Sequence, residues 1–267
     1  MTENPAAFEL LPGADASPVV LHVPHSSRHV PASVRAGIAL DDRALEAELD
    51  HITDAHTADL AERASRAARV APWRCVNRLS RLVVDPERFP DEREEMRAVG
   101  MGAVYTRTTH GAVLRPAGTD PEPLIERFFH PYTRAMTAAV ADRLAATGRA
   151  VVIDVHSYPT ARLPYELHGE GPRPAVCLGT DAFHTPAALV DRAREAFEGV
   201  GTVGIDSPFS GAYVPLRFHG EDPRVTSLMV EIRRDTYMSE PGGPAGPGLA
   251  RLASALGTLV DALSDQP

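Results

Sequence analysis

Three apolar runs of this sequence carry ionisable side chains that could do chemistry. Asp154 and His156 lie two residues apart in VVIDVHS, His25 closes PVVLHVPHS, and Glu231 lies inside LMVEIR. Because alternate residues of a strand point to the same face, Asp154 and His156 should lie together. Histidines at strand ends with a carboxylate nearby are typical of a metal-assisted hydrolase.

A catalytic zinc ion needs three nitrogen or oxygen ligands from the protein and one open position. His25 and His156 are candidate ligands, because the carboxyl ends of neighbouring parallel strands meet at one edge of a sheet. The third ligand should be a carboxylate. Asp50 and Asp54 are candidates in LDHITD, one helical turn apart on a shared face. Taken alone, Asp54 is better explained as part of a solvent-exposed helix face.

Two further acids have both structural and catalytic interpretations. Asp154 is better placed to orient a histidine ligand than to bind metal itself. Glu231 is costly to bury among apolar neighbours without a partner. One possible partner is Arg233, two residues on and on the same face. The alternative is a general base whose pKa is raised by its apolar surroundings. We favour the base, since an ion pair does not explain an acid on a central strand near the histidines.

Arginines near the middle of the chain offer a binding site for an anionic substrate. Arg78, Arg81 and Arg88 lie in NRLSRLVVDPER, and guanidinium groups bind carboxylates in a two-pronged geometry. The alternative is that one or more of these arginines simply pairs with Asp85 or Glu87.

Strands and helices alternate along the chain, which predicts an α/β fold whose mostly parallel sheet is covered on both faces. The predicted strands are Val19–Val23, Val70–Asn77, Leu82–Asp85, Val151–Val155, Ala175–Gly179 and Leu228–Ile232. The predicted helices are Asp42–Arg66, Pro123–Ala146, 186–199 and Gly248–Leu263. Residues 85–118 are expected to form a long functional loop, and residues 208–220 a loop that lines or covers the site.

No linker separates two hydrophobic cores, so residues 1–267 are expected to form a single domain. Residues 1–16 would be an N-terminal extension, and residues 241–267 a hinge and a last helix. The net charge of -9 argues against a nucleic-acid surface. The chain has no secretory segment and no apolar run of about 18 residues, so we expect a cytoplasmic protein without a membrane partner. Cys75 and Cys177 are expected to be buried, reduced thiols.

Several segments, in one order from about residue 18 to residue 240, resemble the N-formylglutamate amidohydrolases. They are VPHSS, LDHITD, RLVVDPERFPDE, MGAVYTRTTHG, HPYTRAM, IDVHSYP, PFSGAYVPLRFHG and VEIRRDTYM. The resemblance implies a three-layer α/β/α sandwich around a mixed sheet, like that of zinc carboxypeptidases and aspartoacylase-like deacylases. It also implies release of formate from N-formyl-L-glutamate, the last step of one route of histidine degradation.

The resemblance further implies roles for individual residues. His25, Asp50 and His156 look like the ligands of one zinc ion per chain. Glu231 resembles the general base, which would take a proton from water and pass it to the leaving nitrogen.

The implied substrate is a small N-acyl amino acid, whose carboxylates would be held by Arg81, Arg88 and Arg233. The chain departs from the family pattern at two places. The family motif Asp-Leu-Asn-Arg is Asp-Pro-Glu-Arg here, with Glu87 replacing a neutral residue, and HPYH is HPYT, with Thr133 replacing a histidine. An alternative is therefore a metal-dependent deacylase or carboxypeptidase-like enzyme that acts on another N-acyl amino acid or on a peptide.

Overall fold

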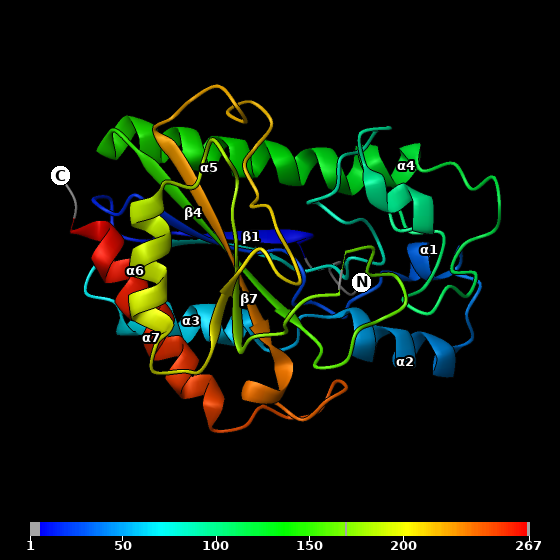
Figure 1. The fold of residues 1–267 in the computed structure, drawn as a ribbon. Coiled ribbons are helices and arrows are strands. Elements are labelled where there is room, and N and C mark those ends of the chain that lie inside the picture. The colour runs from blue at the N-terminus through cyan, green and yellow to red at the C-terminus, as the bar shows by residue number, and fades with distance from the viewer. Residues whose placement is uncertain (1–5, 169, 266–267) are drawn as a thin grey trace.

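A mixed β-sheet runs through the centre of the molecule (Figure 1). The computed structural model describes residues 6–168 and 170–265. Within them the sheet has the order β1-β3-β2-β4-β7-β5-β6. Its strands are β1 (Phe8–Leu11), β2 (Val19–Val23), β3 (Trp73–Asn77), β4 (Ala150–Tyr158), β5 (Val176–Gly179), β6 (Val203–Ile205) and β7 (Val225–Arg233). Only the pairs β1–β3 and β5–β7 are antiparallel, which confirms the mostly parallel sheet.

Helices cover both faces of the sheet and make the three layers that were predicted. They are α1 (Ala32–Arg35), α2 (Asp42–Ile52), α3 (Thr57–Ala67), α4 (Glu122–Leu124), α5 (His130–Thr147), α6 (Ala187–Phe197) and α7 (Gly248–Ser264). In Figure 1, α5 lies along one face, while α3, α6 and α7 lie against the other. Helices α1, α2 and α4 gather with the long loops beside the sheet. None of the described helices is long and apolar enough to cross a membrane.

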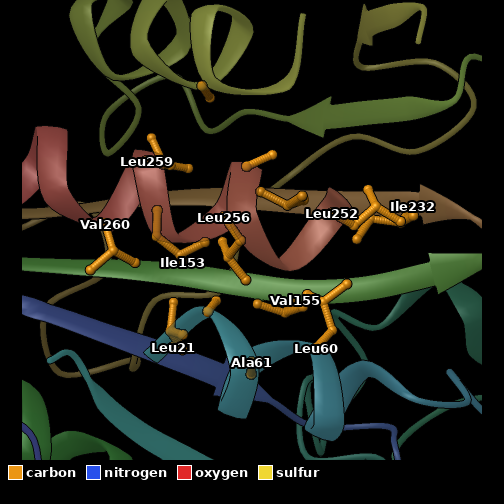
Figure 2. Packing of buried hydrophobic residues seen from close by; sticks show 14 of the residues in the cluster. Leu21, Leu60, Ala61, Ile153, Val155, Ile232, Leu252, Leu256, Leu259 and Val260 are labelled. Atoms are coloured by element: carbon orange, nitrogen blue, oxygen red, sulfur yellow. The ribbon is translucent and has the colours of Figure 1, made fainter. Parts of the chain in front are cut away.

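The alternation of residues along β4 separates the core from the chemistry. Val151, Ile153 and Val155 belong to the apolar cluster that α3, α6 and α7 build. Leu60 of α3 and Leu256 of α7 lie against the strand that carries Ile153 and Val155 (Figure 2). The intervening residues face α5 instead. Asp154 and His156 therefore point to the same face, as the period of two predicts.

Residues 42–66 do not form the single predicted helix. Helix α2 ends at Ile52 and α3 begins at Thr57, and His56 between them has a left-handed backbone with φ 65. Contacts from distant parts of the chain hold this break, because the Tyr237 hydroxyl donates to the carbonyl of Ala55 at 2.7 Å. The backbone N–H of Asp54 donates to the carbonyl of His25 at 3.0 Å.

Three other segments differ from the sequence prediction. The predicted strand Leu82–Asp85 is wrong: Leu82 and Val83 lie in a turn, Val84 and Asp85 follow it, and Arg115 donates to the carbonyl of Leu82. The side chains of this segment are nevertheless buried, which explains its apolar pattern. Strands β1 and β6 were not predicted. Both are short edge strands with one neighbour each, and β1 lies within the residues expected to form an extension. Cys75 and Cys177 are buried and free, as expected.

Helix α7 provides a test of the core. Leu256 is fully buried within the α3–α6–α7 cluster. Leu256→Ala should lower the free energy of unfolding by about 2–5 kcal/mol, because it removes apolar contacts and leaves a cavity. Urea denaturation measures the change. The exposed Ser254 on the same helix is the control, and Ser254→Ala should change stability by no more than about 0.5 kcal/mol. Equal effects of the two substitutions would contradict this packing.

Candidate metal centre

Three buried ligand atoms converge where β2 and β4 end. The Nδ1 atoms of His25 and His156 lie 3.3 Å apart, and Asp54 Oδ2 lies 3.0 Å from Nδ1 of His156 and 3.7 Å from Nδ1 of His25. A tetrahedral zinc ion with ligands at about 2.0–2.1 Å holds its ligand atoms about 3.3 Å apart. The spacing of these nitrogen and oxygen atoms therefore fits the ligands of one such ion.

Each of the three ligand candidates is fixed by a different element. His156 lies on β4, on the face that α5 covers. His25 follows Pro24 directly after β2. Asp54 lies in the break between α2 and α3, tied to His25 by the backbone hydrogen bond described above. The strand ends and the broken helix together bring residues that lie far apart in the sequence to one point.

The opposite ring nitrogens of both histidines contact carboxylates. His25 Nε2 lies 2.9 Å from Asp85 Oδ1, and His156 Nε2 lies 3.1 Å from Asp154 Oδ1. When Nε2–H donates a hydrogen bond to a carboxylate, the neutral ring keeps a free lone pair on Nδ1, which is the form that binds a metal. The location of Asp154 agrees with the orienting role expected from the sequence. For Asp85, sequence reasoning found only a pairing with arginine.

Acidic groups outnumber guanidinium groups around the two histidines. The acids are Asp54, Asp85, Glu87, Asp154 and Glu231, and the guanidinium groups are those of Arg81, Arg88 and Arg234. Although burial opposes it, Arg81 and His25 hold the pKa of Asp85 well below its usual range. Buried carboxylates gathered around two histidines favour a bound divalent cation.

The structure does not bring Asp50, the predicted carboxylate ligand, to the two histidines, and places Asp54 there instead. Asp50 Oδ1 pairs with Arg28 Nη1 at 2.7 Å, and its side chain is 36% exposed. Asp54 is only 2% exposed, so the expectation that it lies on a solvated face is also wrong. The cause is the end of α2 at Ile52. Because the helix stops there, the two aspartates do not share a face.

Glu231 carries a buried carboxylate oxygen that is free to accept a hydrogen bond. It pairs in register with His156 across β4 and β7, and none of the described residues donates to its Oε2. Burial raises the pKa of Glu231 to about 7. The alternative ion pair with Arg233 is not formed, since Arg233 pairs with Asp235 at 2.8 Å and donates to the carbonyl of Arg173.

A cavity of about 990 Å³ opens onto this cluster. His25, Asp54, His156 and Glu231 all line it. So do parts of the segment 208–220 and of the predicted loop 85–118, which confirms that both loops lie at the site. The reacting groups are therefore accessible to a small molecule despite their burial.

The predicted substrate arginines differ in how fully they are engaged. Arg81 donates twice to Asp85 Oδ2, at 3.1 and 2.7 Å. Arg88 also lines the cavity, but its nearest acids are farther away: Asp85 at 3.6 Å and Glu94 at 3.7 Å. The buried Nε of Arg88 has no hydrogen-bond partner among the described residues. Arg88 is thus the better placed of the two to receive a ligand.

Arg233 does not line the cavity, but its neighbour Arg234 does. Arg234 follows the end of β7 and lies 3.2 Å from Asp54 Oδ1. Arg78 instead pairs with Glu9, near the edge strand. The structure therefore brings Arg81, Arg88 and Arg234 to the site and leaves Arg233 outside it.

Comparison with known proteins identifies the relatives of this chain. The family model for N-formylglutamate amidohydrolase matches residues 17–238. The chain belongs to this family. No protein with a curated description matches the sequence.

Two solved structures show the same fold as this family member. One is the N-formylglutamate amidohydrolase from Ralstonia eutropha JMP134, with 24% identity and a TM-score of 0.80 over 97% of this chain and 98% of that chain. The other is a gene product of Agrobacterium tumefaciens, with 21% identity and a TM-score of 0.70 over 96% and 94% of the two chains.

Sequence reasoning missed a chain of buried polar contacts behind the histidines of this N-formylglutamate amidohydrolase family member. Tyr132 O–H lies 2.6 Å from His22 Nε2, and His22 Nδ1 lies 2.8 Å from Asp154 Oδ1. Although burial opposes it, Asp154 and Glu87 raise the pKa of His22 to about 9. Glu87 also lies 3.2 Å from His156 Nε2. The alternation of β2, which points His22 away from Leu21 and Val23, was the signal that could have revealed it.

The two aspartates of LDHITD can be compared directly. If the cluster binds zinc, Asp54→Ala should lower the zinc content of the purified protein severalfold or more, because it removes one of the three candidate ligand atoms, whereas Asp50→Ala should retain zinc. Elemental analysis measures the bound metal. Asp54 also pairs with Arg234, so Asp54→Asn and a circular dichroism spectrum separate metal loss from unfolding. Zinc loss in Asp50→Ala alone would contradict the ligand set.

Proposed function

We propose that this protein is a zinc-dependent amidohydrolase that converts N-formyl-L-glutamate to formate and L-glutamate. One observation carries the proposal. Two histidine Nδ1 atoms and Asp54 Oδ2 converge beside the unpaired carboxylate oxygen of Glu231, inside a cavity. Membership of the family supports the substrate.

One divalent ion per chain would be held by His25, Asp54 and His156. Two nitrogen ligands and one oxygen ligand suit zinc, a borderline-soft ion. When bound, the ion supplies a Lewis acid that activates water and polarises the formyl carbonyl. Asp85 and Asp154 keep the two imidazole rings in the tautomer and orientation that this binding requires.

Glu231 is the proposed general base. Its buried surroundings raise its basicity, and its free Oε2 can accept a proton from water. The same carboxyl group then returns the proton to the leaving nitrogen, so that L-glutamate departs as an amine. Its register neighbour on β4 is His156, which keeps the base adjacent to the ligand cluster.

The arginines divide their roles between substrate and scaffold. Arg88, whose buried Nε has no hydrogen-bond partner among the described residues, binds the side-chain carboxylate of the substrate. Arg81 instead holds Asp85 and thereby fixes the ring of His25. Arg234 holds Asp54 from the cavity side. The substrate is oriented by charge at Arg88, while the metal ligands are oriented by the other two arginines.

Glu231→Gln tests the base. The amide retains the shape of the side chain but cannot accept a proton, so turnover should fall on the order of a hundredfold or more while bound zinc is unchanged. Formate release and elemental analysis of the same sample give both values. A turnover close to that of the unmodified protein would remove Glu231 from the mechanism. Loss of folding without a specific kinetic defect would instead assign it a structural role.

Arg88→Met and Arg81→Met test the division between the arginines. Arg88→Met should lower kcat/KM for N-formyl-L-glutamate by about tenfold to a hundredfold, the strength of a hydrogen bond to a charged group. The loss should be smaller for N-formyl-L-glutamine, which lacks the second carboxylate. Arg81→Met should lower zinc content and activity toward both substrates alike. If the unmodified protein hydrolyses formyl derivatives of glutamate, glutamine, alanine and methionine at equal rates, the proposed substrate preference is wrong.

A further inference from the structure

The mouth of the cavity carries positive charge that the reaction described above does not use. We propose that Arg134 and Arg217 form a second anion-binding subsite, which takes the distal carboxylate of an N-formylated acidic peptide. This inference rests on the proposed function, because it extends the same site outward. It names a substrate class larger than N-formyl-L-glutamate.

The first argument is the pairing of the arginines that line the cavity. Arg81, Arg88, Arg93 and Arg234 each have an acidic partner. Arg134 on α5 and Arg217 in the segment 208–220 line the same cavity and are exposed. Their side chains form no ion pair and no hydrogen bond with the part of the chain that the structure describes. Their charges are therefore available to a ligand. The guanidinium carbon of Arg217 lies 5.4 Å from the centroid of the Phe218 ring, which gives it an apolar support.

The outer acids of the cavity do not neutralise these two arginines. Asp181 accepts the backbone N–H groups of Phe183 and His184 and lies 3.8 Å from His219. Glu95 lies 3.3 Å from His168. Both acids thus have partners of their own, and neither pairs with Arg134 or Arg217.

The second argument is the charge at the floor of the cavity. Glu87 is only 14% exposed and lies 3.2 Å from His156 Nε2. Together with Asp54 and Glu231 it makes the floor acidic. A substrate carboxylate close to Glu87 is repelled, whereas one several bonds farther out meets Arg134 and Arg217.

The third argument is size. A volume of about 990 Å³ lies at the upper end of the range of roughly 300–1,000 Å³ found for sites of drug-sized ligands. N-formyl-L-glutamate is smaller than such ligands. Because its formyl carbon carries only hydrogen, any longer substrate must extend from the amino-acid side. An acidic residue joined to the glutamate by a peptide bond would reach outward and carry the distal charge.

The experiment compares extensions that differ in charge alone. We expect kcat/KM for N-formyl-L-glutamyl-L-glutamate to exceed that for N-formyl-L-glutamyl-L-glutamine amide by about tenfold, mainly through KM, because charged pairing at an exposed mouth is weak to moderate. In the double variant Arg134→Met, Arg217→Met this ratio should fall close to one. The control Arg251→Met removes an exposed arginine of α7, outside the cavity, and should keep the ratio.

A binding measurement separates failure of this subsite from failure of the proposed function. Calorimetry with the zinc-loaded protein compares L-glutamyl-L-glutamate with L-glutamyl-L-glutamine amide, and needs no hydrolysis. If no formyl substrate is cleaved, but the acidic dipeptide binds more tightly and loses that advantage in the double variant, the subsite stands and the reaction is wrong. If N-formyl-L-glutamate is cleaved and the acidic extension gives no advantage, the subsite is overturned. An advantage that survives in the double variant overturns it as well.

Discussion

Two buried imidazole rings that face each other through their Nδ1 atoms are the constraint on which the rest of this structure depends. At 3.3 Å, two nitrogen lone pairs are unfavourable neighbours unless a proton or a cation lies between them. Asp85 and Asp154 fix this arrangement, because each occupies the far nitrogen of one ring. The pair of rings is thus prepared for a cation by contacts on the side away from it.

Each carboxylate in this cluster is in turn held by a cation or a polar group of the scaffold. Arg81 binds Asp85, His22 binds Asp154, and Arg234 binds Asp54. A buried acid without such a partner would shift its pKa and become neutral, and would then no longer orient a histidine. Glu231 is the exception. Its nearby arginine, Arg233, is engaged by Asp235 and by a backbone carbonyl, which leaves the acid free to exchange a proton.

The sequence predicted the strands correctly where the local pattern of apolar residues determines the structure. The runs of apolar residues predicted β2, β4 and β7. The alternation along β4 placed Asp154 beside His156, and the meeting of parallel strand ends indicated His25 and His156 as neighbours. The sequence favoured Asp50 beside the histidines, but the structure places Asp54 there, because α2 stops at Ile52. Contacts with Tyr237 and Gly243 hold the turn that follows. No local pattern reports contacts between residues more than a hundred positions apart. The same limit explains Leu82–Asp85, whose buried side chains resemble those of a strand although its first two residues lie in a turn.

The distribution of charge in the cavity couples the proposed metal to the proposed substrate. Five acids surround the histidines, and they face three guanidinium groups and the protonated ring of His22. Without a bound divalent ion the floor therefore has no excess of positive charge that would attract an anionic substrate. A divalent ion held by His25, Asp54 and His156 would add the positive charge and would remove the repulsion between the two Nδ1 lone pairs. Because one ion would act both on the charge at the floor and on the two lone pairs, its binding would stabilise the folded cluster and favour binding of an anionic substrate. Arg134 and Arg217 lie at the mouth and attract an anion whether or not the divalent ion is bound at the floor. The order of binding that we propose is the divalent ion first, then the anionic substrate at Arg134 and Arg217, and then movement of the substrate toward Glu231.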